Sequence, residues 1–182
     1  MKKVYLFILG AFLFSVNGFS QKDNNQVGVG ADLSFPSGDF GDAFKTGFGG
    51  YVKGMYGVGV AGQISFTTGY SSFKAKGSDD ILKASINVIP LLIGYRHHFN
   101  GFFAEPQIGY GSYKYKIKGG DDDFEIDESD GEGAFTWALG AGYIFNEKIE
   151  VSARYQSANR DGGNLGAFGL RIGYNFSLGK RN

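Results

Sequence analysis

The sequence predicts an all-β protein, an eight-stranded antiparallel up-and-down transmembrane β-barrel. Three observations predict this fold. Apolar and polar side chains alternate along eight segments, the polar face of those segments is too small and too charged to make a dry core, and the connections alternate between long and short. The composition agrees, since Gly accounts for 31 of 182 residues, aromatic side chains for 16% and Pro for only 3 residues.

The same composition excludes several classes of protein. Because Cys is absent, the chain has neither a disulfide scaffold nor a cysteine-based metal or redox site. Lys and Arg number 18 and so do Asp and Glu, so there is no electrostatic argument for a nucleic-acid partner.

Residues 1–20 have the pattern of a secretory signal peptide. Lys2 and Lys3 precede an apolar segment from Val4 to Val16, and small residues follow before Gln21. An apolar segment of this length is too short to cross a bilayer as a helix. We therefore expect cleavage before Gln21, export, and a single barrel domain over residues 21–182.

Large apolar side chains mark one face of each of the first four strands. They are Val27, Val29, Leu33 and Phe35 in segment 27–35; Phe48, Val52 and Tyr56 in 46–56; Val58, Val60, Ile64 and Phe66 in 58–70; and Ile89, Leu91, Ile93 and Tyr95 in 83–97. In the last of these, Ile86 and Val88 precede a change of phase at Pro90. A β-bulge there would tolerate the N–H that proline lacks.

The last four strands alternate in the same way. Their apolar faces carry Ala104, Pro106, Ile108 and Tyr110 in 102–117; Phe135, Trp137, Leu139 and Tyr143 in 134–145; Ile149, Val151, Ala153 and Tyr155 in 149–156; and Phe168, Leu170, Ile172, Tyr174 and Phe176 in 168–178. The opposite faces hold Gly, Ser and charged residues, which could not form the core of a soluble barrel. We therefore expect the apolar faces to meet lipid and the polar faces to line the interior.

The connections between these strands give an independent indication. Those at 36–45, 71–82, 118–132 and 158–165 are long, whereas those near Gly57, at 98–101 and at 146–147 are short. A membrane barrel has short periplasmic turns and longer extracellular loops. Aromatic residues at both ends of the strands predict two girdles, with Tyr56, Tyr95, Tyr143, Phe145, Tyr174 and Phe176 at the periplasmic rim and Tyr70, Phe135, Trp137, Tyr155 and Phe168 at the outer rim.

Over residues 26–178 the chain resembles the small eight-stranded outer-membrane β-barrels of Gram-negative bacteria, of the OmpX and OmpA-barrel type. The stretch from Pro36 to Gly49 is similar to the first loop and second strand of "outer membrane protein beta-barrel domain" sequences. The stretch Arg171–Leu178 looks like the β-signal read by the barrel assembly machinery. The resemblance implies an integral protein of the cell outer membrane with lipids and lipopolysaccharide as partners. We also expect a monomer, because a closed barrel leaves no strand edge to pair.

Alternation assigns charged side chains of both signs to the interior. They are Asp32, Glu105, Glu150, Arg154 and Arg171, with Lys53 and Arg96 on less regular strands. Buried charges must be paired, so we expect a network of salt bridges in a lumen that eight strands leave about filled. The network is interpreted as a plug that makes the barrel rigid. The alternative is a gate whose pairs exchange and admit small ions.

One connection is strongly acidic. Its carboxylates are Asp121, Asp122, Asp123, Glu125, Asp127, Glu128, Asp130 and Glu132. So many oxygen ligands could collect Ca²⁺ or bridge through it to lipopolysaccharide, although the spacing is not that of an EF-hand. A solvated loop extended by charge repulsion is the favoured interpretation, so no metal site is assigned.

No motif supports an enzyme or a cofactor. Gly57–Gly62 matches a dinucleotide fingerprint, but its glycines open a strand and no helix N-terminus follows them. His97 and His98 are the only histidines and fall at a short turn. We predict a non-enzymatic protein with a structural or surface-contact role. The alternatives are a narrow porin-like channel, an enzyme at the barrel rim, and a soluble lipocalin-like binder, which would require an apolar lumen.

Overall fold

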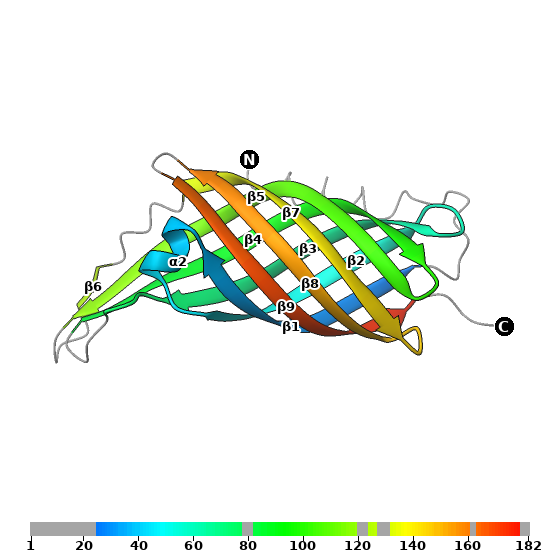
Figure 1. Ribbon diagram of the computed structural model, residues 1–182, viewed down its shortest axis with the longest axis horizontal. Helices are drawn as coiled ribbons and strands as arrows, with labels where there is room; N and C mark the ends of the chain where they lie inside the picture. Colours follow the sequence, from blue (N-terminus) through cyan, green and yellow to red (C-terminus); the bar gives the residue numbers. More distant parts are fainter. Residues whose placement is uncertain (1–24, 78–81, 120–123, 127–131, 161–162, 179–182) are drawn as a thin grey trace, which may run out of the picture.

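The computed structural model describes residues 25–77, 82–119, 124–126, 132–160 and 163–178. Eight long strands form a closed antiparallel barrel, because each pairs with the next and β1 pairs with β9 (Figure 1). They are β1 (Gln26–Ser37), β2 (Gly47–Gly57), β3 (Gly62–Lys74), β4 (Leu82–Phe99), β5 (Phe102–Gly119), β7 (Glu132–Phe145), β8 (Ile149–Arg160) and β9 (Gly163–Ser177). The predicted fold class is confirmed.

Two short elements accompany the barrel. Helix α2 (Asp39–Ala43) lies between β1 and β2, and β6 (Phe124–Ile126) pairs only with β5, extending the β4–β5 hairpin beyond the barrel (Figure 1). Within the described ranges, no helix has the length and apolar character needed to cross a membrane.

The two ends of the barrel differ. At one end, here called the tight-turn end, the connections 58–61, 100–101 and 146–148 join β2 to β3, β4 to β5 and β7 to β8. Asn100 and Gly101 both have positive φ, 49° and 89°, which is the conformation of a two-residue type I′ hairpin. The opposite end, with α2 and β6, is here called the loop end (Figure 1). Short turns belong to the periplasmic side of membrane barrels.

The barrel has its apolar side chains outside, as predicted. Leu139, Val151, Leu170 and Ile172 are 46–58% exposed, whereas Arg171 on the same stretch of β9 is 5% exposed. In a closed barrel all backbone groups of the strands pair with neighbours, so this surface can face hydrocarbon without leaving an unpaired edge. The alternation of apolar and polar residues therefore predicted correctly which face of these strands points outward and which points into the barrel.

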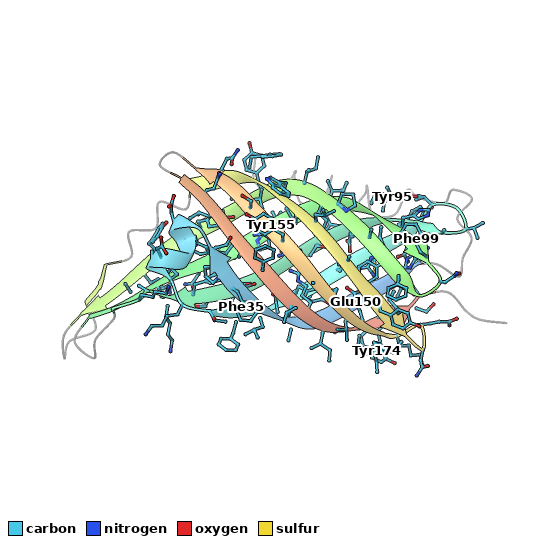
Figure 2. All side chains as sticks on the ribbon, in the orientation of Figure 1. Phe35, Tyr95, Phe99, Glu150, Tyr155 and Tyr174 are labelled. Carbon is cyan, nitrogen blue, oxygen red and sulfur yellow. The ribbon has the colours of Figure 1, made fainter. Side chains whose placement is uncertain are left out.

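Aromatic rings gather at both ends of the strands. Tyr95, Phe99 and Tyr174 lie towards the tight-turn end, while Tyr155 and Phe35 lie nearer the loop end (Figure 2). Neighbouring strands bring these rings into contact, with centroids 4.7 Å apart for Tyr155 and Phe168. Such rings suit the boundary between acyl chains and headgroups.

The expected β-bulge at Pro90 is not present. The partners of β4 on both β3 and β5 follow one register from end to end, although the β3 ladder omits Ile89 and Pro90. Ile86 and Val88 therefore face the interior together with Leu92 and Arg96. The sequence pattern changed because the interior itself becomes apolar towards the loop end, and the strand did not turn over.

The last connection is also shorter than predicted. The sequence suggested a loop at 158–165, but β8 continues to Arg160 and β9 begins at Gly163, with Ala158 paired to Leu165. Strand pairing outweighed the local Gly and Asn signals because the two strands extend their ladder beyond the apolar belt. Long and short connections therefore do not alternate without exception.

An apolar cluster fills the interior at the loop end. Its buried members are Phe40, Phe73, Ile86, Val88, Tyr113, Ala134 and Ala158. Helix α2 places Phe40 over the barrel mouth, where its ring lies 5.1 Å from that of Phe73. Tertiary packing must hold this helix, since five residues are too few for a stable isolated helix. The sequence prediction of a wholly polar interior is thus wrong for this end.

Candidate functional site

Four charged side chains from four strands meet in the lumen towards the tight-turn end, and we call them the four-charge cluster: Lys53 of β2, Arg96 of β4, Glu105 of β5 and Glu150 of β8. Lys53 Nζ lies 2.7 Å from Glu105 Oε2 and 3.7 Å from Glu150 Oε1. Arg96 bridges both carboxylates, with Nη2 2.7 Å from Glu105 Oε2 and Nη1 2.8 Å from Glu150 Oε2 (Figure 2 shows Glu150 on its strand).

Three of these four contacts join strands that are not neighbours in the sheet, and the fourth, Arg96 to Glu105, joins the paired strands β4 and β5. Arg96 on β4 and Lys53 on β2 each reach Glu150 on β8, on the other side of the barrel. All four side chains are at most 4% exposed. The cluster therefore crosses the lumen as an electrostatic brace.

Neutral groups satisfy the remaining hydrogen-bonding capacity of this cluster. Ser65 and Gln107 donate to Glu105 Oε1 at 2.6 and 2.9 Å. The Phe103 ring lies 3.8 Å below the Arg96 guanidinium, a cation–π contact in a desolvated site. A buried ionic network is stable only when its members are satisfied in this way.

A second group, the Asp32 cluster, lies on β1, β8 and β9 and consists of Asp32, Arg154 and Arg171. Arg171 Nε and Nη2 both donate to Asp32 Oδ2, at 3.0 and 2.9 Å. Ser34 donates to Asp32 Oδ1 at 2.9 Å. Arg154 lies further away, with its Nη2 3.9 Å from Asp32 Oδ2.

Two inward glycines near this cluster, Gly30 and Gly173, are covered by an aromatic ring. The Tyr51 ring packs over Gly30 and Gly173, where a Cβ at Gly30 would lie only 2.7 Å from ring atoms. The Arg171 guanidinium stacks on the same ring, 4.4 Å from the Tyr51 ring centroid. Here the absence of a side chain is required for close approach, because a Cβ would overlap the ring.

All seven charged residues that alternation assigned inward lie in the interior, and the fold divides them between the two clusters. Sequence reasoning missed Tyr51, Phe103 and Phe40. Tyr51 shares the parity of Lys53 and could have been found from it, since residues two apart share a face. Phe40 carried no such signal, because its position depends on how α2 folds back over the barrel.

Other residues singled out in the sequence lie elsewhere. His98 Nε2 is 2.8 Å from Gln63 Oε1, and His97 contacts Tyr95 near the tight-turn end. Gly57–Gly62 spans the turn from β2 into β3. The side chains of the acidic stretch from Asp121 to Glu132 lie outside the described residues, and among the described ones no group of three metal-ligating side chains is arranged to hold an ion.

Comparisons with known proteins agree with this architecture. Residues 6–176 match the family described as "Outer membrane protein beta-barrel domain". No curated protein matches the sequence.

Several solved structures are similar to the chain in fold. The crystal structure of Ail, the attachment invasion locus protein of Yersinia pestis, in complex with the heparin analogue sucrose octasulfate, has a TM-score of 0.63 at 17% identity, covering 85% of this chain and 99% of that one. Neisserial surface protein A gives 0.56 at 13%, covering 85% and 97%. The N-terminal β-barrel domain of Pseudomonas aeruginosa OprF gives 0.51 at 16%, covering 85% and 99%.

Proposed function

Since this chain belongs to the outer membrane protein β-barrel domain family, we propose that it is a non-enzymatic, non-conducting integral protein of the outer membrane. Its role is structural or one of surface contact, with the rigid barrel holding its loop end at the cell surface. The observation that carries this proposal is that the lumen is filled at two levels.

The first level is the four-charge cluster. An ion crossing the barrel would have to displace side chains that are at most 4% exposed and that bind one another at 2.7–2.8 Å. Breaking one such pair leaves an uncompensated charge in a desolvated site, which costs about 3–5 kcal/mol. This cost makes spontaneous exchange of partners rare, and it favours the plug over the gate.

The second level is the apolar cluster at the loop end. Phe40, Phe73 and Ile86 are at most 4% exposed and pack in one apolar cluster inside the barrel. Because the two obstructions lie in series, relieving one leaves the other in place. An apolar constriction also opposes ions by excluding their hydration water.

The outer surface supports lipid as the surrounding partner. Its exposed apolar side chains form a continuous belt around all eight strands, and the aromatic rings at the ends suit the headgroup regions. The barrel assembly machinery is the proposed partner of Arg171–Leu178, whose outward side chains Ile172, Tyr174 and Phe176 lie on the final strand. Closure leaves the strands without an open edge, which supports a monomer.

Conductance in planar bilayers tests the proposal against a narrow pore. The purified protein is inserted at defined orientation, and insertion is verified by the change of gel mobility on boiling. We expect no discrete conductance steps in 1 M KCl. At this salt concentration the Debye length is about 3 Å, so long-range electrostatic barriers to ion entry are screened.

The matched variant for this test is Phe40→Ala with Phe73→Ala, which opens only the loop end. It should remain silent, because the four-charge cluster still blocks the lumen. Regular steps from the wild-type protein would show that the barrel is a channel and would refute the proposal.

A further inference from the structure

The interior charges of the described strands do not balance. Four cations, Lys53, Arg96, Arg154 and Arg171, face three carboxylates, Asp32, Glu105 and Glu150. The four-charge cluster is neutral, with two of each sign. The excess positive charge therefore belongs to the Asp32 cluster, where one carboxylate meets two guanidinium groups.

Within that cluster Arg154 is the cation without a close counter-ion. Asp32 is already occupied by Arg171 and Ser34, so Arg154 Nη2 donates to the neutral amide oxygen of Gln156, at 2.6 Å. The Arg154 side chain is only 9% exposed. Its Nη1 is buried and has no hydrogen-bond partner in the portion of the chain that is described.

An unsatisfied guanidinium nitrogen in such a place needs an explanation. A buried donor without an acceptor loses its full hydration, and the loss is larger when the group is charged. The strands around Arg154 supply no further carboxylate, because its register partners on β7 and β9 are Gly140 and Gly169. The fold thus places glycines where an acidic partner could have stood.

A cavity of about 30 Å³ adjoins this side chain. Its polar lining comes from Arg154, Gln156, Ser34 and Ser71, and its far wall from the apolar cluster. Since the guanidinium only donates, Gln156 must turn its oxygen to Arg154, and its NH₂ group can donate elsewhere. The Ser71 hydroxyl is a third donor on the wall.

We propose that this cavity binds one small monovalent anion of the size of chloride. Arg154 Nη1 is its principal donor, and the Gln156 NH₂ group and the Ser71 hydroxyl complete its environment. One negative charge brings the Asp32 cluster, where two guanidinium groups face one carboxylate, to neutrality, which is what a buried ionic group requires. The volume of about 30 Å³ suits a single small ion, since one water needs roughly 10–15 Å³ by the same measure.

Halide dependence of stability tests the site in the full-length protein in a non-ionic detergent. Sodium bromide, sodium chloride and sodium gluconate are compared at equal ionic strength. The apparent Tm is the temperature at which half of the protein changes from the fast, folded gel mobility to the slow, unfolded one. Chloride at about twenty times its Kd should raise Tm by roughly 4 °C over gluconate, because it binds only the folded barrel. Crystals grown in bromide should show one anomalous peak within hydrogen-bond distance of Arg154.

Two variants separate the site from general salt effects. Gln156→Glu places a carboxylate beside Arg154, so this variant should fold, lose the halide dependence and lack the bromide peak. Lys53→Met changes the other cluster and should keep both. Arg154→Gln should lose both as well, and Gln156→Glu serves if that variant fails to fold.

Equal Tm in chloride and gluconate for the wild-type protein would overturn the proposal. So would a bromide-grown crystal with only water in the cavity. A halide response that survives Gln156→Glu would also overturn it, since the effect would then arise elsewhere.

Discussion

Replacing Glu105 by glutamine removes one charge from the four-charge cluster and preserves its shape. Glu105 accepts from Lys53 Nζ at 2.7 Å, from Arg96 Nη2 at 2.7 Å and from Ser65 at 2.6 Å. After the substitution two cations share one carboxylate, Glu150, in a site at most 4% exposed. Leaving one buried charge uncompensated costs about 3–5 kcal/mol.

We therefore expect Glu105→Gln to lower the free energy of unfolding by about 4 kcal/mol. The assay is urea unfolding in lipid vesicles, followed by the fraction of protein that keeps the fast, folded gel mobility. Because the charge imbalance causes the loss, Lys53→Met should partly rescue it. The double variant leaves Arg96 paired with Glu150, and it should be about 2 kcal/mol more stable than the sum of the single effects predicts.

An exposed lysine at the loop end is the control. Lys114→Gln should change the free energy of unfolding by less than about 0.5 kcal/mol, as surface substitutions usually do. The reasoning is refuted if Glu105→Gln costs no more than this control, or if the two single effects simply add. Either result would mean that water screens the cluster and that the lumen is open to solvent.

Three further substitutions probe other parts of the barrel. Leu170→Arg puts a charge on the lipid-facing side of β9 at its middle residue, where Leu170 is 54% exposed, and should cost about 2–4 kcal/mol in the same vesicle assay. A cost below about 0.5 kcal/mol, as for an ordinary surface substitution, would contradict the lipid-facing assignment. Tyr51→Ala removes the ring that packs over Gly30 and Gly173 and should lower the free energy of unfolding by about 3–5 kcal/mol. A loss below about 1 kcal/mol in the urea titration would contradict this packing role. Phe40→Ala should release α2 while the strands stay intact. Amide hydrogen exchange should then accelerate at Asp42 and Phe44, whose N–H groups bond within that segment. Unchanged exchange at these two amides would show that Phe40 does not hold the helix.

The residue alternation alone determined which way most side chains point. Strands with one apolar face can close into a soluble barrel with that face inside or into a membrane barrel with that face outside. The charged residues on the opposite face exclude the soluble barrel. This is why Leu170 could be assigned to lipid and Asp32, Glu105 and Arg171 to the interior without coordinates. Parity along a strand is a local property, and local order in the sequence is enough to establish it.

Only the tertiary structure decided which of these groups meet. Asp32 and Arg171 are 139 positions apart and become partners because the last strand closes onto the first. The excess charge on Arg154 likewise follows from strand order, since register places Gly140 and Gly169 beside it. Phe40 reaches the barrel mouth only because a short helix folds back over it, where it joins the apolar side chains that the strands direct inward at the loop end. Contacts across a lumen depend on shear and closure, and no periodicity along one strand contains that information.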